Sequence, residues 1–420
     1  MNSIINQNRF DLMAKLLYIK NFEKNIHSIF YEKLYKEHIN TFNKNWEYPG
    51  TKVKIEDFIE SFNNLITSIK KRGFDKNFPI EVGNLNNTLK NGAHRLMISY
   101  YFNLKPDIKN YKLNCSTYNY DFFLNRNNYW RRDNEIYSNL SVKYADRMAL
   151  EYVKIKKNIR CMILYPTSFK FGKEKNIQNI IDKYGNIYYK KQIKLSKNGV
   201  INLIKELYRG ESWVGGMFPG DHCGGKFKLC YEDKPVIMYL IEFNNCNKII
   251  EFKEKCRELF KIGKHSLHIS DEINDTFRIA SSLLNDNSIH FLNNANNNII
   301  SDKIRKYLIE FFNNYSVNKD SNNMCLTSSL IMELYGLRNA KDIDYIHIND
   351  SKIKIKMFGC HDDNWIKYYK IPKNEIIYNP ENYFYFNGFK FVSLNILKRM
   401  KQNRNEEKDR NDLKLINKLI

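Results

Sequence analysis

The sequence has no long apolar run and no leader segment. Nowhere in its 420 residues do about 18 apolar residues follow one another, so a membrane-spanning helix is not expected. The first residues, Met1 to Asn8, contain no basic segment followed by an apolar one, which argues against a secretory signal peptide. We therefore expect a cytoplasmic protein.

Cysteine is sparse and its spacing follows no known pattern. No Cys-x-x-Cys pair occurs. In a chain of this length, scattered cysteines indicate free, reduced thiols and exclude a disulfide framework. The eight cysteines occupy positions 115, 161, 223, 230, 246, 256, 325 and 360.

Acidic residues are outnumbered by basic ones. The chain has 68 Lys and Arg against 46 Asp and Glu, a formal net charge of +22. One explanation is a polyanionic partner such as nucleic acid, because Lys and Arg displace counterions from phosphate groups. The other is a composition rich in Lys, Asn, Ile and Tyr, as A+T-rich genomes produce. The even spread of basic residues along the chain favours this second explanation. Small phosphorylated substrates would also suit a basic protein.

The length allows about three domains at roughly 150 residues each. A hydrophobic content of 43% is enough to form buried cores, and the asparagine-rich segment 293–298 marks one boundary. We predict an α+β multidomain protein with modules at residues 1–155, 158–290 and 298–420.

Hydrophobic spacing predicts the elements of each module. The first is expected to be helical over 9–70 with a turn at Pro49-Gly50, followed by strands at 79–82 and 87–89 and a helix over 96–102. The second alternates strands at 161–164, 187–195 and 236–243 with helices at 176–184, 199–208, 252–259 and 275–284. The third has helices at 300–313 and 330–334, strands at 343–348 and 352–357, a hairpin at 383–392 and a long helix over 394–420.

The first module contains Asn91-Gly92-Ala93-His94-Arg95 at a predicted helix start. The segment resembles the ParB/sulfiredoxin family, which includes CTP-binding segregation proteins, ATP-using sulfiredoxin and a free-serine kinase. The resemblance implies that Gly92, His94 and Arg95 bind nucleotide phosphates, and amides at a helix start with an arginine suit an anion. Asn91 replaces the usual acidic residue, and Ala93 replaces the cysteine of a sulfinic acid reductase. The alternative is a helix cap with a surface His-Arg pair.

The second module ends in His268-Ile269-Ser270-Asp271, after Cys256-Arg257-Glu258. This order resembles nucleoside diphosphate kinase, whose fold is ferredoxin-like and whose catalytic histidine lies in a His-Gly-Ser-Asp motif. The resemblance implies that His268 carries the phosphoryl group, while Arg257 and Ser270 contact nucleotide or phosphate. Tyr165-Pro166-Thr167 replaces the family's Lys-Pro-Asp, and Ile279 replaces a glutamate. The alternative is a degenerate domain with a structural histidine.

The third module carries Ser328-Ser329 and, after twelve residues, Asp342-Ile343-Asp344. The i, i+2 spacing places both carboxylates on one face of a strand. The pattern resembles nucleotidyltransferases, in which a turn with serine contacts phosphate and two aspartates hold Mg²⁺. That resemblance makes Asp342 and Asp344 catalytic metal ligands and Ser328 and Ser329 phosphate-binding. Candidates for a third carboxylate are Asp362, Asp363 and Glu375, and the tail resembles a basic helix of that family through Lys401, Arg404, Lys408, Asp409 and Asp412.

Together these motifs predict a phosphate-handling enzyme that uses Mg²⁺ and ATP or another nucleoside triphosphate. The expected activity is phosphotransfer, nucleotidyl transfer or both, to a small hydroxylated metabolite, with surface glycan decoration as one setting. The kinase family often forms oligomers. Two alternatives stay open: a nucleotide sensor without turnover, and a basic nucleic-acid-binding protein.

Overall fold

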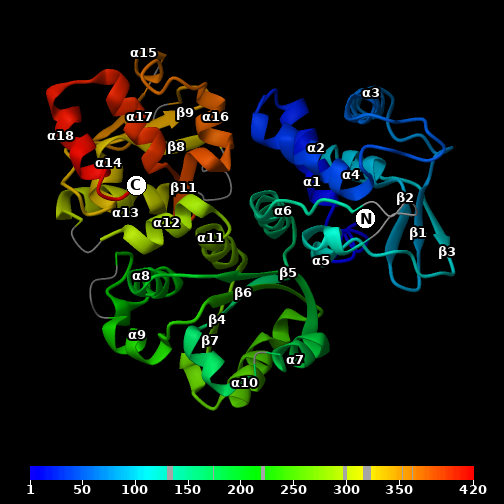
Figure 1. Ribbon diagram of the computed structural model, residues 1–420, viewed down its shortest axis with the longest axis horizontal. Coiled ribbons are helices and arrows are strands. Elements are labelled where there is room, and N and C mark those ends of the chain that lie inside the picture. Colours follow the sequence, from blue (N-terminus) through cyan, green and yellow to red (C-terminus); the bar gives the residue numbers. More distant parts are fainter. Residues whose placement is uncertain are drawn as a thin grey trace. The chain divides into compact units, whose positions relative to one another are not determined.

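The computed structural model describes residues 1–129, 136–173, 175–218, 223–296, 300–315, 323–351, 353–361 and 363–420. The chain divides into two compact units, Met1–Tyr152 and Val153–Ile420 (Figure 1). Both units combine helices and sheets, so the predicted α+β multidomain class is confirmed. The predicted second and third modules lie together in the second unit, each with its own sheet.

The first unit is mainly helical, with one small sheet. Its sheet has the order β2-β1-β3, in which β1 is antiparallel to β2 and parallel to β3. α1 contacts α2 and α4, and α3 contacts α4 (Figure 1). The helices are α1 (Leu12–Glu23), α2 (Ile29–Asn43), α3 (Ile55–Arg72), α4 (Ala93–Tyr101), α5 (Tyr120–Leu124) and α6 (Val142–Ile155), and the strands are β1 (Ile80–Gly83), β2 (Thr88–Asn91) and β3 (Ile108–Tyr111).

The predicted helical stretch 9–70 is divided into three helices. Lys44, which follows α2, adopts a left-handed backbone that ends the helix. Hydrophobic spacing did not predict β3, because the first three residues of this strand are exposed. α3 has an apolar stripe, in which Phe58, Phe62 and Ile66 are buried at spacings of four residues.

The second unit begins with a four-stranded antiparallel sheet of order β5-β6-β4-β7. α7 and α10 pack together on the core of this sheet, and α11 contacts β4 (Figure 1). α8 and α9 are inserted between β5 and β6, so the core follows the order β-α-β-β-α-β. The elements are β4 (Ile159–Leu164), α7 (Ile177–Tyr184), β5 (Gly185–Ile193), α8 (Lys197–Leu207), α9 (Gly224–Cys230), β6 (Val236–Phe243), α10 (Ile249–Phe260), β7 (Leu267–Ile269) and α11 (Ile273–Leu283).

A five-stranded mixed sheet of order β10-β9-β8-β12-β11 completes the second unit. α12 contacts both α8 and β11, so it joins the two halves of this unit. The elements are α12 (Asp286–Asn294), α13 (Asp302–Asn314), β8 (Met324–Thr327), α14 (Ser329–Leu334), β9 (Ile343–His347), β10 (Phe358–Cys360), α15 (Asp363–Ile366), α16 (Lys373–Tyr378), β11 (Tyr383–Phe386), β12 (Phe389–Val392), α17 (Leu394–Arg404) and α18 (Glu407–Ile416).

Two predicted elements of the third module were wrong in extent. The strand expected at 352–357 is absent over 353–357, although Ile353 and Ile355 are buried, and the left-handed Met357 precedes β10 instead. The long terminal helix is broken at Asn405, whose left-handed backbone ends α17. The break folds α18 back onto α17.

Among the described residues, none of the helices is long and apolar enough to span a lipid bilayer.

Candidate functional site

A pocket of about 410 Å³ in the second unit brings the nucleotidyltransferase-like residues together. Serines after β8 and aspartates at the start of β9 form one side, and cationic side chains from α17 and α18 form another. The pocket is lined by Ser328, Ser329, Arg338, Lys341, Asp342, Asp344, Gly359, Cys360, His361, Trp365, Lys401, Arg404 and Lys408.

The turn between β8 and α14 holds a serine in a backbone conformation typical of glycine. Ser328 has φ 66° and ψ −140°, and it stands where the resembled family carries glycine. A residue with a Cβ is strained there by about 1–3 kcal/mol. The Ser328 hydroxyl hydrogen-bonds Asp344, so the strained residue contacts a predicted metal ligand.

Comparing two substitutions separates this strain from the hydroxyl contact. Ser328→Gly and Ser328→Ala both lose the hydroxyl, but only glycine adopts φ 66° without a steric penalty. We expect the glycine variant to have a free energy of unfolding about 1–2 kcal/mol above that of the alanine variant. Urea denaturation of both variants measures this difference, and an alanine variant as stable as the glycine variant would show that the turn is unstrained.

The two predicted aspartates lie at the start of β9, as the i, i+2 spacing requires. Ser329 Oγ is 3.5 Å from Asp342 Oδ1, a long contact. Burial acts to raise the pKa of Asp344, but hydrogen bonds from His361 and Ser328 outweigh it, so the pKa lies below its usual value. Asp344 is therefore ionised at neutral pH. Gly359 lies opposite it on β10, and a Cβ there would be 3.0 Å from Asp344 Oδ1.

A histidine that no sequence motif had indicated lies beside Asp344. His361 Nε2 is 3.5 Å from Asp344 Oδ2, and His361 Nδ1 is 3.1 Å from the hydroxyl of Tyr369. That hydroxyl is 2.8 Å from Thr327 Oγ1, and the imidazole stacks on Trp365 with ring centroids 4.9 Å apart. The imidazole is thus held from two sides with Nε2 toward the carboxylate.

Two of the three candidates for a third carboxylate, Asp363 and Glu375, are not among the described residues that line this pocket. Asp363 is exposed and pairs with Lys373, and Glu375 accepts a hydrogen bond from Asn379. Asp362 lies outside the described residues.

The cationic side of the pocket is held by a buried network of alternating charge. Arg404 donates two hydrogen bonds to Asp409, at 2.7 and 2.6 Å, and Arg338 donates two to Asp412, at 2.5 and 2.7 Å. Lys401 pairs with both aspartates, at 3.3 and 2.5 Å. Asp409 and Asp412 are almost fully buried, so they orient the three cations.

The described part of the chain shows no group of three or more His, Cys, Asp or Glu side chains arranged to hold a metal ion. Mg²⁺, however, is commonly held by one or two carboxylates, with substrate phosphates and water as the other ligands. Asp342 and Asp344 fit that donor set because both are pocket carboxylates beside phosphate-sized space lined with cations.

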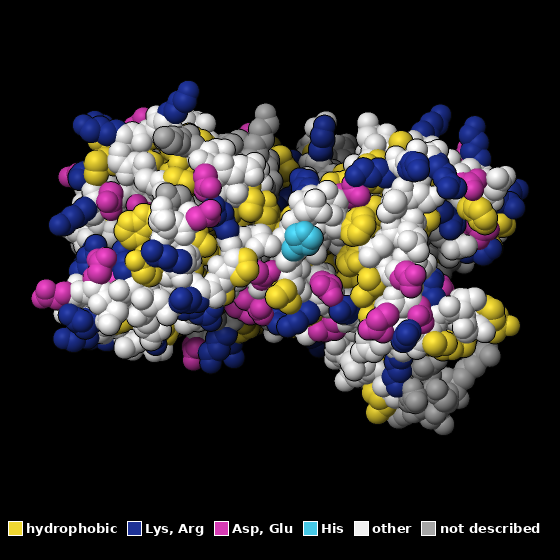
Figure 2. All heavy atoms as spheres, turned by 90° about the horizontal axis from the view of Figure 1, so that it is seen from above, with side chains coloured by type: hydrophobic (Ala, Val, Ile, Leu, Met, Phe, Trp, Pro, Cys, Tyr) yellow, Lys and Arg dark blue, Asp and Glu magenta, His cyan; other side chains and the backbone are white. Residues whose placement is uncertain are grey.

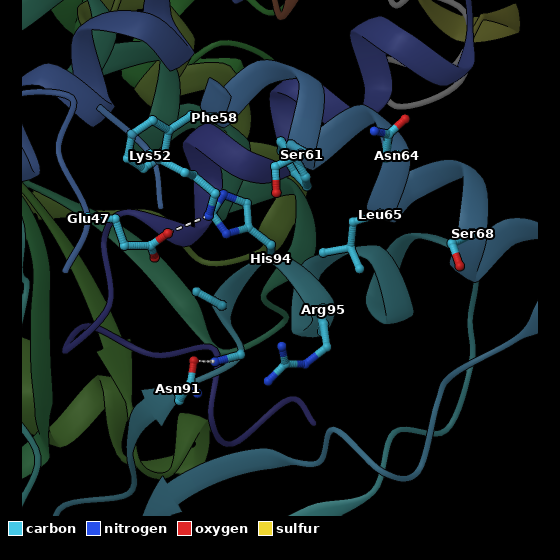
Figure 3. A pocket seen from close by; sticks show the side chains of 13 residues that line it. Glu47, Lys52, Phe58, Ser61, Asn64, Leu65, Ser68, Asn91, His94 and Arg95 are labelled. Atoms are coloured by element: carbon cyan, nitrogen blue, oxygen red, sulfur yellow. Dashed lines mark hydrogen bonds and ion pairs between the residues drawn. The ribbon is translucent and has the colours of Figure 1, made fainter. Parts of the chain in front are cut away.

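A second pocket, of about 480 Å³, contains the ParB/sulfiredoxin-like residues of the first unit (Figure 3). Gly92 has φ 94° and precedes α4, which begins three residues before the start of the helix expected over 96–102. The lining residues are Glu47, Lys52, Phe58, Ser61, Phe62, Asn64, Leu65, Ser68, Asn91, Gly92, Ala93, His94 and Arg95.

The histidine and arginine of that motif have different surroundings. His94 Nε2 is 2.9 Å from the hydroxyl of the buried Tyr35. Burial lowers the pKa of His94 well below its usual value, and Lys15 adds to this effect. Arg95 donates one long bond, of 3.3 Å, to the Pro79 carbonyl, while its buried Nε has no partner among the residues that the structure describes. A guanidinium with free donors beside a pocket suits the binding of an anion.

The three kinase-like residues, His268, Arg257 and Ser270, each have contacts of their own. Burial lowers the pKa of His268 to about 3, so its imidazole is neutral. Its ring meets Tyr208 edge to face, and within the described residues it has no hydrogen-bond partner. Arg257 pairs with Glu254, and the buried Ser270 hydroxyl accepts a bond from the Cys161 amide.

Basic side chains are scattered over the face of the molecule shown in Figure 2, where they alternate with acidic and apolar ones. This distribution agrees with the even spread of Lys and Arg along the sequence.

Comparisons of the chain with protein-family models, with curated proteins and with solved structures return no match.

Proposed function

We propose that the second unit transfers a nucleotidyl group from a nucleoside triphosphate to the hydroxyl of a small metabolite. The observation that supports this proposal is the pocket itself, which places Ser328, Ser329, Asp342 and Asp344 opposite a cationic wall. Two carboxylates next to fixed cations suit a reaction in which negative charge develops on phosphate oxygens.

In the proposed reaction the acceptor oxygen bonds to the α-phosphorus as the bond from that phosphorus to the β-phosphate oxygen breaks. The hydroxyl proton passes to solvent or a nearby base, and pyrophosphate leaves. Asp342 and Asp344 would hold Mg²⁺, which when bound supplies a Lewis acid for the phosphate oxygens. Arg338, Lys401 and Arg404 would neutralise the phosphates in positions fixed by Asp409 and Asp412.

A second candidate activity is phosphotransfer through His268. Its neutral imidazole and the β-α-β-β-α-β order, which resembles the ferredoxin-like core of nucleoside diphosphate kinase, favour it. Within the described part of the chain the ring has no orienting hydrogen-bond partner of the kind that such nucleophiles use, which weakens this candidate relative to the pocket. Were both activities present, phosphotransfer would supply a phosphorylated acceptor for nucleotidyl transfer.

Labelled nucleotide distinguishes these activities. We expect ATP or another nucleoside triphosphate labelled at the α-phosphate to pass its label to an acceptor alcohol, with release of pyrophosphate. Label from the γ-phosphate on the protein, lost in His268→Ala, would identify phosphotransfer instead. Tight binding of every nucleotide without turnover would make the chain a sensor, and salt-dependent retention on DNA or RNA would make it a nucleic-acid-binding protein.

We also propose that the pocket of the first unit binds a phosphate group. The unpartnered Nε of Arg95 and its neighbour Gly92, at the start of α4, support this.

A further inference from the structure

We infer that the first-unit pocket takes a phosphorylated sugar or polyol rather than a nucleotide. This inference rests on the proposed binding of phosphate by Arg95. It concerns the remainder of the ligand, which the wall formed by α3 would contact.

One wall of the pocket is a stripe of hydroxyl and amide side chains. Ser61, Asn64 and Ser68 follow one another at spacings of three and four residues, so they share a face of α3. Figure 3 shows them along one side of the pocket, facing the side formed by Asn91 to Arg95. All three side chains are exposed, and within the described residues none has a hydrogen-bond partner. They are free to bond to ligand hydroxyls.

His94, on the facing side formed by α4, adds a further polar group to the pocket. Its Nε2 is occupied by Tyr35, while Nδ1 has no partner in the described part of the chain. Across the pocket, Lys52 donates a bond of 2.5 Å to the Glu47 carboxylate, which has other lone pairs that accept from hydroxyls. The pocket therefore offers donors and acceptors on two sides.

The phenyl rings of the pocket offer no platform for a nucleobase. Phe58 and Phe62 are only 4% and 2% exposed. The Phe62 ring is covered by Tyr18, Tyr35 and His94, with centroids 5.2, 5.3 and 4.4 Å away. Where a protein binds a nucleobase without base-specific hydrogen bonds, stacking on an open aromatic face supplies much of the binding energy. Polar walls without such a face favour a polyhydroxylated ligand.

Calorimetric titration of the full chain tests this inference with three probes: inorganic phosphate, ribose 5-phosphate and ATP. Binding in this pocket is identified by its loss in Arg95→Leu, which separates it from binding in the second unit. We expect ribose 5-phosphate to bind about tenfold or more tightly than inorganic phosphate, because hydrogen bonds of about 1 kcal/mol each are added.

A triple variant, Ser61→Ala, Asn64→Ala and Ser68→Ala, should remove that advantage and leave the affinity for inorganic phosphate unchanged. Thr67→Ala, outside this lining on the same helix, is the matched control and should change neither. The inference would be overturned if ATP bound more tightly than ribose 5-phosphate, in an Arg95-dependent way, and the triple variant did not change its affinity. The proposed phosphate site would then still stand. Binding of no probe that depends on Arg95 would overturn the phosphate site itself.

Discussion

Asp344→Asn is expected to reduce nucleotidyl transfer by about three orders of magnitude, since several kcal/mol of charge stabilisation are lost. The carboxylate is partly buried, lies 3.5 Å from His361, and is ionised because hydrogen bonds lower its pKa. Asparagine has the same shape but no charge, so it would keep the packing around Gly359 and remove the metal-binding oxygen charge. The release of pyrophosphate at saturating Mg²⁺ measures the effect.

The control for this substitution is Asp350→Asn, which removes a carboxylate outside the lining of the pocket. Asp350 is partly exposed and pairs with Lys373. We expect it to keep at least about half of the activity, because exposed ion pairs contribute little. Equal loss in both variants, or full activity in Asp344→Asn, would remove Asp344 from the proposed reaction.

The sequence analysis predicted the side of this pocket whose residues lie close together in the chain. A turn with serine followed by two aspartates at i, i+2 is a local pattern, and a strand places its alternate residues on one face whatever the sheet around it. That is why Ser328, Ser329, Asp342 and Asp344 are found together. Three residues of the basic tail, Lys401, Arg404 and Lys408, also line the pocket.

The side of the pocket that contains His361 depends on the register between strands, and no local sequence pattern predicts it. His361 follows β10, and that strand pairs in parallel with β9 so that Gly359 lies opposite Asp344. The pattern of Ile353 and Ile355 had placed the strand too early, because burial of alternate residues does not require pairing. The sequence analysis also missed Arg338. Its partner Asp412 lies far along the chain and comes close to Arg338 because α18 packs against α17.

The first unit shows the converse case, in which a predicted motif is positioned by residues far from it in sequence. Asp11 Oδ1 and Oδ2 each accept a bond of 2.8 Å from Arg9, and Oδ2 accepts one of 2.7 Å from Lys15. Arg9 also donates to the Leu89 carbonyl at 2.9 Å, which ties this network to β2. β2 leads directly to Gly92 and α4, so the network anchors the strand before the pocket.

Asp11→Asn is expected to lower the free energy of unfolding of the first unit by about 3–5 kcal/mol, because Arg9 and Lys15 would stay buried without a counter-charge. All three side chains are at most 6% exposed. Asp107→Asn, an exposed carboxylate in the same unit, is the matched control and should have almost no effect. Hydrogen exchange of α1 and α4 amides during urea unfolding measures this unit separately, since a chain of two units need not unfold in one step.

The same network gives the first unit a dependence on acid. Burial acts to raise the pKa of Asp11, but Arg9 and Lys15 hold it far below its usual value. A carboxyl with a depressed folded pKa contributes stability above its unfolded pKa of about 4 and loses it as pH falls. We expect a loss of about 1.4 kcal/mol for each pH unit below about 4, absent from Asp11→Asn. An identical acid dependence in both proteins would assign the loss to other carboxylates, and the proposed anchor of β2 would then be too weak to position Arg95.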